Sequence, residues 1–159
     1  MGMTDKEQRW REVTAKVLQI TDKLGQKVDE GIVEAVVALN ALGIATFMSC
    51  EGHLDHGIAA PWADFDTKEG ETSKTRTADQ QLMMFLELFY QDRYVPYDCY
   101  LTLNIRGHGK GKGRLQSQGA VFQAILPEDL RQQRLRAYQE EMQTFTAFLK
   151  EQYFSSTNE

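Results

Sequence analysis

The chain has 159 residues, of which 42% are apolar and 26% charged, a composition typical of a globular protein and not of a disordered one. This length predicts a single domain over residues 1–159. Apolar runs are far shorter than the ~20 residues of a membrane helix, so we expect no membrane segment. The 18 basic and 23 acidic residues give a net charge of −5. That charge argues against general nucleic-acid binding, because phosphate contacts need a basic face.

The cysteine content and the first residues indicate a reducing compartment. Cys50 and Cys99 are too few for a disulfide framework. Residues 1–6 lack the apolar core of a signal peptide, so the expected location is the cytoplasm, where both thiols stay reduced.

The first part of the chain predicts two helices. Thr4 and Glu7 form a capping-box pattern, and apolar residues then recur at spacings of three and four until Gly25, which should end the helix. A second helix is predicted over residues 29–42, with Gly43 as its stop. Its inner face should carry Ile32, Val36 and Leu39.

Two short strands are predicted next. Residues 44–49 contain β-forming side chains and follow a helix-ending glycine. Residues 59–66 form the second strand, where Pro61 requires an edge position or a strand start because proline donates no hydrogen bond to a ladder. Residues 67–75 are nearly all polar and predict an exposed loop.

The second half predicts a helix, a hairpin and a last helix. A capping-box pattern begins a helix over residues 77–90. Residues 99–106 alternate between apolar and polar, and residues 114–125 are again extended, so the two segments predict an antiparallel hairpin. Pro127 suits the first turn of the final helix. The apolar seam of that helix is Leu135, Tyr138, Met142, Phe145 and Leu149.

This order of elements predicts an α+β fold, with a mostly antiparallel sheet of about four strands packed against helices. Two partners are open for the seam of the last helix. It can pack on the sheet of its own chain, or it can form a homodimer with a second subunit.

The segment Met48-Ser49-Cys50-Glu51-Gly52-His53-Leu54-Asp55-His56 gathers the reactive side chains of the chain after a predicted strand. Thiolate and imidazole are good ligands for zinc or iron, so Cys50, His53 and His56 are candidate metal ligands. Their spacing supplies at most three ligands, and the rest must come from the fold. In an enzyme of this kind Cys50 and His53 would hold the ion, and Glu51 would be the candidate acid or base.

Two other interpretations of the same segment stay open. Cys50 can be a nucleophile activated by His53 or His108, with Gly52 exposing backbone amides to an oxyanion. Alternatively, the cysteine can be a small buried hydrophobe, and the histidines can form hydrogen bonds only within their own turn.

A second constellation is the run Arg106-Gly107-His108-Gly109-Lys110-Gly111-Lys112-Gly113-Arg114. Free glycine amides and basic side chains can cradle a phosphate or a carboxylate, which makes Arg106, His108 and Lys110 candidate ligand-binding residues. The other interpretation is an exposed hairpin tip. We also count Trp62 and Asp64 as candidate ligand-binding residues, because they follow the first cluster closely.

The pattern Thr46-x-x-Ser49-Cys50-Glu51-Gly52-His53, followed by Pro61-Trp62, resembles a signature of bacterial proteins of uncharacterised function over residues 43–65. That resemblance supports the location of a site and implies no activity. The core Ser49-Cys50-x-Gly52 is also similar to the Ser-Cys-Ser-Gly-Arg stretch of the wybutosine-synthesis methyltransferase family. Here His53 stands in place of the arginine, and three matching residues carry over no substrate.

Three hypotheses follow. The first is a small cytoplasmic enzyme or ligand-binding protein with a Cys/His/carboxylate site, for which zinc or iron is the expected metal and a small molecule the expected ligand. The alternative is a non-enzymatic oligomeric module that binds an anionic ligand or nucleic acid through the Gly/Lys-rich loop. The third is a purely structural protein.

Overall fold

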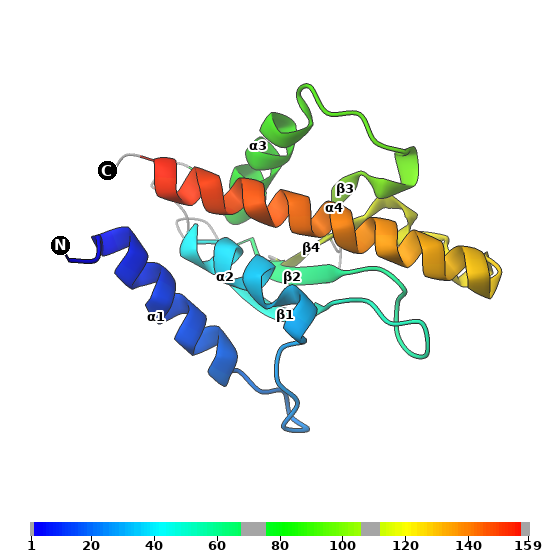
Figure 1. Ribbon diagram of the computed structural model, residues 1–159, viewed down its shortest axis with the longest axis horizontal. Coiled ribbons are helices and arrows are strands. Elements are labelled where there is room, and N and C mark those ends of the chain that lie inside the picture. The colour runs from blue at the N-terminus through cyan, green and yellow to red at the C-terminus, as the bar shows by residue number, and fades with distance from the viewer. Residues whose placement is uncertain (1, 68–75, 106–111, 157–159) are drawn as a thin grey trace.

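The computed structural model describes residues 2–67, 76–105 and 112–156, which form an α+β fold (Figure 1). The helices in these ranges are α1 (Asp5–Gln19), α2 (Val33–Ala41), α3 (Ala78–Tyr90) and α4 (Glu128–Ser155). The strands β1 (Thr46–Cys50), β2 (Trp62–Asp66), β3 (Leu101–Ile105) and β4 (Lys112–Ser117) form one antiparallel sheet in the order β1-β2-β4-β3. The predicted fold class is confirmed.

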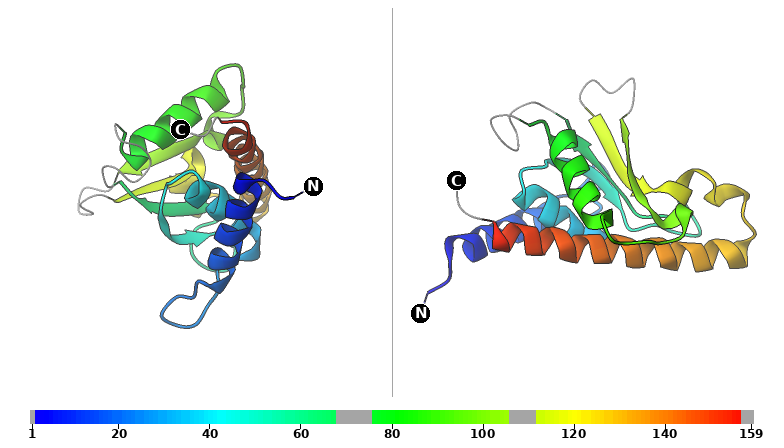
Figure 2. Two further views of the ribbon diagram at one scale, coloured as in Figure 1. Left: turned by 90° about the vertical axis from the view of Figure 1, so that its left-hand side faces the viewer. Right: turned by 90° about the horizontal axis from the view of Figure 1, so that it is seen from above.

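The helices gather on one face of the sheet (Figure 2). Phe65 of β2 and Leu115 of β4 point into this layer and are fully buried. They meet apolar side chains of α2, α3 and α4 in one core cluster, and α1 packs against α2 as an outer layer. The same alternation turns Trp62, Asp64, Arg114 and Gln116 to the other face of the sheet.

Helix α2 is buried on nearly every side. Ile32, Val36 and Leu39, the predicted inner face, are each at most 1% exposed. The helix begins through a 3-10 turn at Glu30–Ile32, and Gly43 follows it with a φ of +87°, so the predicted glycine stop is confirmed.

Helix α1 is shorter than its apolar pattern predicts. It ends at Gln19, and residues 20–28 form a small hairpin with a bridge between Thr21 and Lys27. The carboxylate of Asp22 accepts hydrogen bonds from the backbone N–H groups of residues 24 and 26, at 2.8 Å each. This local bonding offers the backbone an alternative to the helix, and the prediction that the helix runs to Gly25 was wrong.

Strand β2 lies inside the sheet, between β1 and β4. Pro61 immediately precedes it, so the proline marks a strand start and not an edge strand. Strand β1 is an edge strand, and its register on β2 shifts between Thr46 and Met48, which leaves Phe47 as an irregularity. Residues 68–75 of the predicted polar loop lie outside the described residues.

The hairpin of β3 and β4 is confirmed, although both strands are shorter than predicted. Cys99 is buried and is the last residue of a 3-10 turn before β3. Strand β4 ends at Ser117, and two 3-10 turns replace the predicted extension to residue 125. At Gly119 an added Cβ would lie 2.1 Å from the hydroxyl of Tyr138, so the chain turns there beneath α4.

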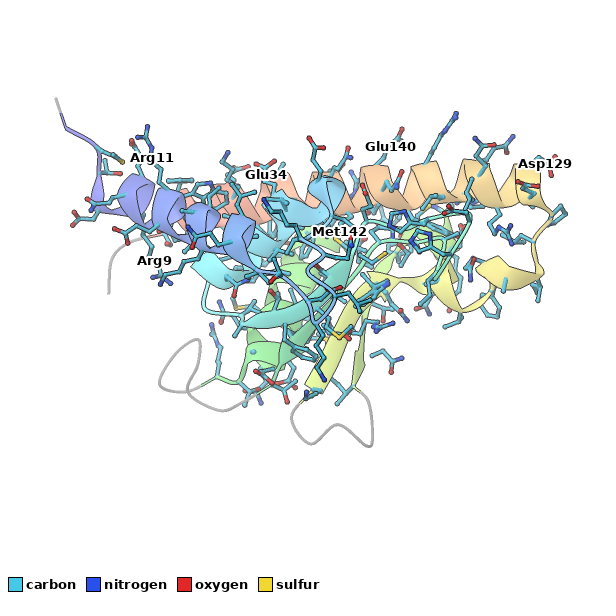
Figure 3. The ribbon with its side chains drawn as sticks, turned by 90° about the horizontal axis from the view of Figure 1, so that it is seen from below. Arg9, Arg11, Glu34, Asp129, Glu140 and Met142 are labelled. Atoms are coloured by element: carbon cyan, nitrogen blue, oxygen red, sulfur yellow. The ribbon has the colours of Figure 1, made fainter. Side chains whose placement is uncertain are left out.

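The seam of α4 packs inside its own chain. Its members Leu135, Tyr138, Met142, Phe145 and Leu149 are at most 8% exposed. Figure 3 shows Met142 pointing from α4 toward the body of the protein and Glu140 pointing away from it. A second subunit on this helix would therefore need a face other than the seam. Within the described ranges, no helix has the length and apolarity that crossing a membrane requires.

Candidate functional site

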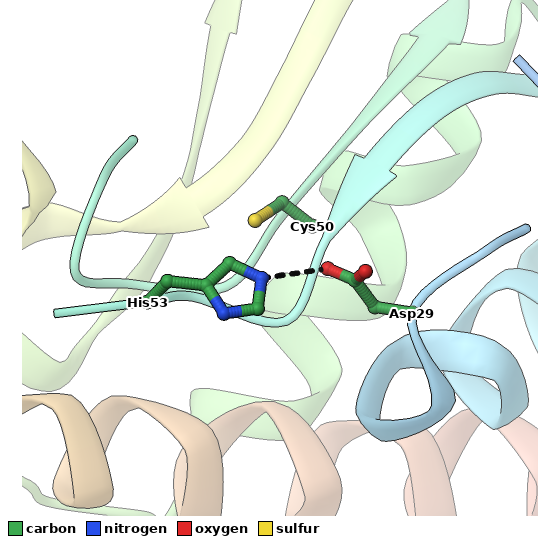
Figure 4. A group of neighbouring side chains, drawn as sticks. All are labelled: Asp29, Cys50 and His53. Atoms are coloured by element: carbon green, nitrogen blue, oxygen red, sulfur yellow. Dashed lines mark hydrogen bonds and ion pairs between the residues drawn. The ribbon is translucent and has the colours of Figure 1, made fainter. Parts of the chain in front are cut away.

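Three side chains from two separate segments converge at the end of β1. They are Asp29, Cys50 and His53 (Figure 4). One ligand atom from each lies within 4.8 Å of the others. The closest approach is 3.0 Å, between Oδ2 of Asp29 and Nε2 of His53. The side chains are half-buried, so the cluster is sheltered and still reaches solvent.

The chain reaches this geometry through a tight turn at Gly52. Cys50 is the last residue of β1, and Gly52 follows with a φ of +93°, a conformation that side chains other than glycine rarely adopt. An added Cβ there would lie 2.7 Å from the Leu135 side chain and 2.9 Å from the backbone of Ala60. The N–H of His53 then donates to the carbonyl of Ile58 at 3.2 Å, which closes the loop that carries the imidazole.

Asp29 comes from the segment before α2. It precedes the 3-10 turn but makes no side-chain capping bond to it. Its carboxylate instead accepts a hydrogen bond from the N–H of Glu51 at 3.0 Å and lies against His53. Burial alone would raise the pKa of Asp29, but these two contacts hold it below its ordinary value.

The environment of Cys50 disfavours the free thiolate. Burial raises the pKa of the Cys50 thiol, and the neighbouring negative charge of Asp29 raises it further. The N–H of Gly52 lies 3.4 Å from the sulfur and lowers the pKa of the thiol, but the net pKa is still raised. A bound cation would reverse this balance, since a coordinating thiol is deprotonated by the metal.

The orientation of the imidazole disfavours a nucleophile relay. In a relay, one ring nitrogen faces the nucleophile and the other faces the carboxylate. Here Nε2 faces Asp29, and Figure 4 shows Nδ1 turned away from both Asp29 and Cys50. One sulfur, one nitrogen and one oxygen atom therefore lie within 4.8 Å of one another, a spacing from which all three can reach one ion.

The dimensions agree with a small transition metal. Ligand atoms bonded at about 2.0 Å to a tetrahedral ion lie about 3.3 Å apart. The Asp29–His53 separation of 3.0 Å is near that value. The separations within the whole set are at most 4.8 Å, so the ligand atoms would have to move closer together to bind an ion.

His56 belongs to a second, more exposed group. Its Nδ1 lies 2.8 Å from the carboxylate of Asp55, and its ring stacks on that of His53 with centroids 4.2 Å apart. The set His53, Asp55 and His56 also has metal-ligand spacing. His53 is shared by the two groups, whereas the set that contains Cys50 has Asp29 as its third member and not His56.

Glu51 lies next to the cluster in the chain, but its carboxylate is not one of the clustered ligand atoms. Its carboxylate lies against Gly31, where an added Cβ would be 2.2 Å from Oε2. The backbone carbonyl of Glu51 accepts a hydrogen bond from Gln139 of α4 at 3.1 Å. The side chain is therefore directed toward the turn before α2.

Trp62 and Asp64 lie on the outer face of the sheet in a different arrangement. The carboxylate of Asp64 accepts two hydrogen bonds from Arg114, at 2.6 and 3.0 Å, and both side chains are buried. The guanidinium of Arg114 stacks on the ring of Trp62 at 3.9 Å. Cys50 and Trp62 are partners in the β1–β2 register, so Trp62 is near the cluster. The Asp64 carboxylate instead forms the ion pair with Arg114.

Arg106, His108 and Lys110 lie outside the described residues. Cys99 is buried in a separate core group, where the guanidinium of Arg134 lies 3.0 Å from its sulfur.

Asp29 was not among the predicted site residues. An aspartate at the start of a predicted helix normally serves as its N-cap, and that role accounts for Asp29 from sequence alone. Only the fold shows that its carboxylate bonds Glu51 and His53, which follow it by 22 and 24 residues.

Comparison of the chain with models of protein families, with curated proteins and with solved structures finds no match. The chemistry of the site is therefore inferred from its own geometry.

Proposed function

We propose that this protein is a metal-dependent enzyme whose ion is held by Asp29, Cys50 and His53. The observation that supports this proposal is the convergence of a carboxylate, a thiol and an imidazole within 4.8 Å. Three protein ligands leave a coordination position open, as in catalytic zinc sites. The mixed set of sulfur, nitrogen and oxygen suits zinc or ferrous iron.

The ion would supply an activated water or polarise a carbonyl of a bound substrate. The protein residues hold the ligands in place. Glu51 donates its backbone N–H to Asp29, and the Gly52 turn orients the ring of His53. The Glu51 side chain remains the proposed acid or base, a role that requires it to turn from Gly31 toward the cluster.

Metal binding tests this proposal directly. The purified chain is stripped with chelator, dialysed, and titrated with Co²⁺ while its absorption spectrum is recorded. Because Cys50 is a ligand, we expect a thiolate-to-cobalt charge-transfer band at one equivalent of metal. Competition with Zn²⁺ should remove this band, since affinity for zinc exceeds that for cobalt in most such sites.

Matched variants identify the ligands. Cys50→Ser should abolish the band, whereas Cys99→Ser should retain it. Asp29→Asn and His53→Gln should each lower the affinity more than about 100-fold, because even outer-sphere partners of a metal site contribute 10- to 100-fold. His56→Gln is the control for His53→Gln. Absence of the band, or its loss in the Cys99 variant alone, would contradict the proposal.

A further inference from the structure

An open groove lies beside β1 and leads toward the cluster. Its volume is about 180 Å³, which is room for about six water molecules. Apolar side chains contribute much of its lining, from the 20–28 hairpin, α2 and β1. They are Ile20, Val28, Val36, Phe47 and Met48.

The groove and the cluster are adjacent in the chain at two of the groove's walls. Val28 lines the groove and is followed in the chain by Asp29, a proposed metal ligand. Ser49 lines the opposite wall and is followed by Cys50. A molecule lying in the groove therefore contacts the residues that directly precede two of the proposed ligands.

The wall formed by β1 also presents its backbone. Strand β1 is at the edge of the sheet, and β2 pairs with only one of its sides. The N–H of Glu51 points to the other side, where it meets Asp29. Since backbone groups of alternate residues in a strand point to the same side, the N–H and carbonyl of Ser49 face the groove. Among the described residues outside the sheet, none forms a hydrogen bond with them.

These features favour an extended peptide over a purely apolar ligand. A free strand edge offers hydrogen bonds to the main chain of a peptide, and the apolar part of the adjacent groove accepts one of its side chains. Exposed Phe47 and Met48 lie at this edge, 41% and 57% accessible. An alkyl chain would use the groove and leave the polar edge unpaired.

We propose that the substrate of the metal centre is an extended peptide that pairs with Ser49 of β1 and places an apolar side chain in this groove. This inference rests on the proposed function, since the metal is what makes the bound peptide a substrate. The proposal concerns binding and defines the substrate class.

A pool of random octapeptides is the probe. The full-length protein is incubated with the pool, separated from unbound peptide by gel filtration, and its bound peptides are identified by mass spectrometry. We expect enrichment of leucine, isoleucine, valine or phenylalanine at one position. The enriched peptide is then resynthesised with the main-chain amides of all its odd-numbered or all its even-numbered residues methylated. Methylation of the set that faces β1 should abolish binding because the methyl groups prevent strand pairing.

Two matched variants locate the binding site. Ile20→Lys places a charge in the groove and should weaken binding of the enriched peptide more than about tenfold. Leu24→Lys lies in the same hairpin, is 85% exposed and does not line the groove, so it should leave the affinity unchanged. Circular dichroism of both variants verifies that they are folded.

The outcomes separate this inference from the proposed function. No enriched peptide, equal binding by Ile20→Lys, or equal binding of both methylated peptides each overturns the peptide proposal, whatever the cobalt titration gives. Peptide binding that passes all three tests in a protein that binds no cobalt instead overturns the metal enzyme and, with it, the role of the peptide as substrate.

Discussion

Asp29 and His53 are separated by 24 residues in the chain, and their Oδ2 and Nε2 atoms lie 3.0 Å apart. The contact connects the segment before α2 to the turn after β1. It also places a carboxylate beside the Cys50 thiol, which has consequences for pH dependence and for thiol reactivity.

The contribution of Asp29 to stability should disappear in acid. The pKa of Asp29 is lowered from its ordinary value of 3.8, so the stabilisation is present above pH 3.8 and is lost as the pH falls through the lower value in the folded protein. We expect Asp29→Asn to reduce the free energy of unfolding by about 1 kcal/mol near neutral pH, for hydrogen bonds to a charged but partly exposed group. Urea denaturation at pH 7 and below pH 3.8 measures this difference. A difference that persists unchanged in acid would contradict the assignment.

The reactivity of Cys50 should respond to the charge of Asp29. Burial raises the pKa of the Cys50 thiol and Asp29 raises it further, so the thiolate fraction is smaller than for a free cysteine. In a Cys99→Ser background, Asp29→Asn should therefore speed the alkylation of Cys50 by iodoacetamide. The rate is followed by mass spectrometry at pH 8 without metal. A slower or equal rate would show that Asp29 does not act on the thiol.

The turn at Gly52 should tolerate no side chain. Gly52→Ala combines an unfavourable φ with contacts below 3.0 Å to Leu135 and to the Ala60 backbone. We expect a loss of about 3 kcal/mol in the free energy of unfolding. Gly57→Ala is the control, because Gly57 also has a positive φ, +65°, but has open space around it. It should lose only about 1 kcal/mol, and equal losses would show that the close contacts do not matter.

The ion pair of Asp64 and Arg114 should be structural. Asp64→Ala leaves a buried guanidinium without its carboxylate, which should cost about 3 to 5 kcal/mol. The double variant Asp64→Leu, Arg114→Met should recover most of this loss, since it removes both charges. Chemical denaturation gives the energies. The cobalt affinity of the double variant should equal that of the wild type, and a large decrease would instead make Asp64 part of the metal site.

Sequence patterns predicted the helices well where the apolar spacing of the chain matches the face that the fold buries. The seam of α4 and the inner face of α2 follow directly from apolar spacing, and both are buried. Element ends were less predictable, because they depend on side chains that bond nearby backbone. Asp22 ends the helical pattern of α1 early, and the crowding of Gly119 beneath α4 ends the extended segment after β4.

The candidate site was only partly predictable from the sequence for a different reason. Cys50 and His53 are close in the chain and come together through one glycine turn, which the sequence indicates. Asp29 is close to them only through the packing of the segment before α2 against the end of β1. Asp64 has the right chemistry for a ligand, but its carboxylate is taken by Arg114, which lies 50 residues later in the chain.

Asp29 directly follows the hairpin of residues 20–28 and is also a ligand of the proposed metal site. Its carboxylate fixes the end of one groove wall through the N–H of Glu51. An ion that draws Asp29 toward Cys50 would therefore also change the position of the wall. Coupling between two binding equilibria is reciprocal, so any factor by which the ion changes the affinity for a peptide is also the factor by which the peptide changes the affinity for the ion.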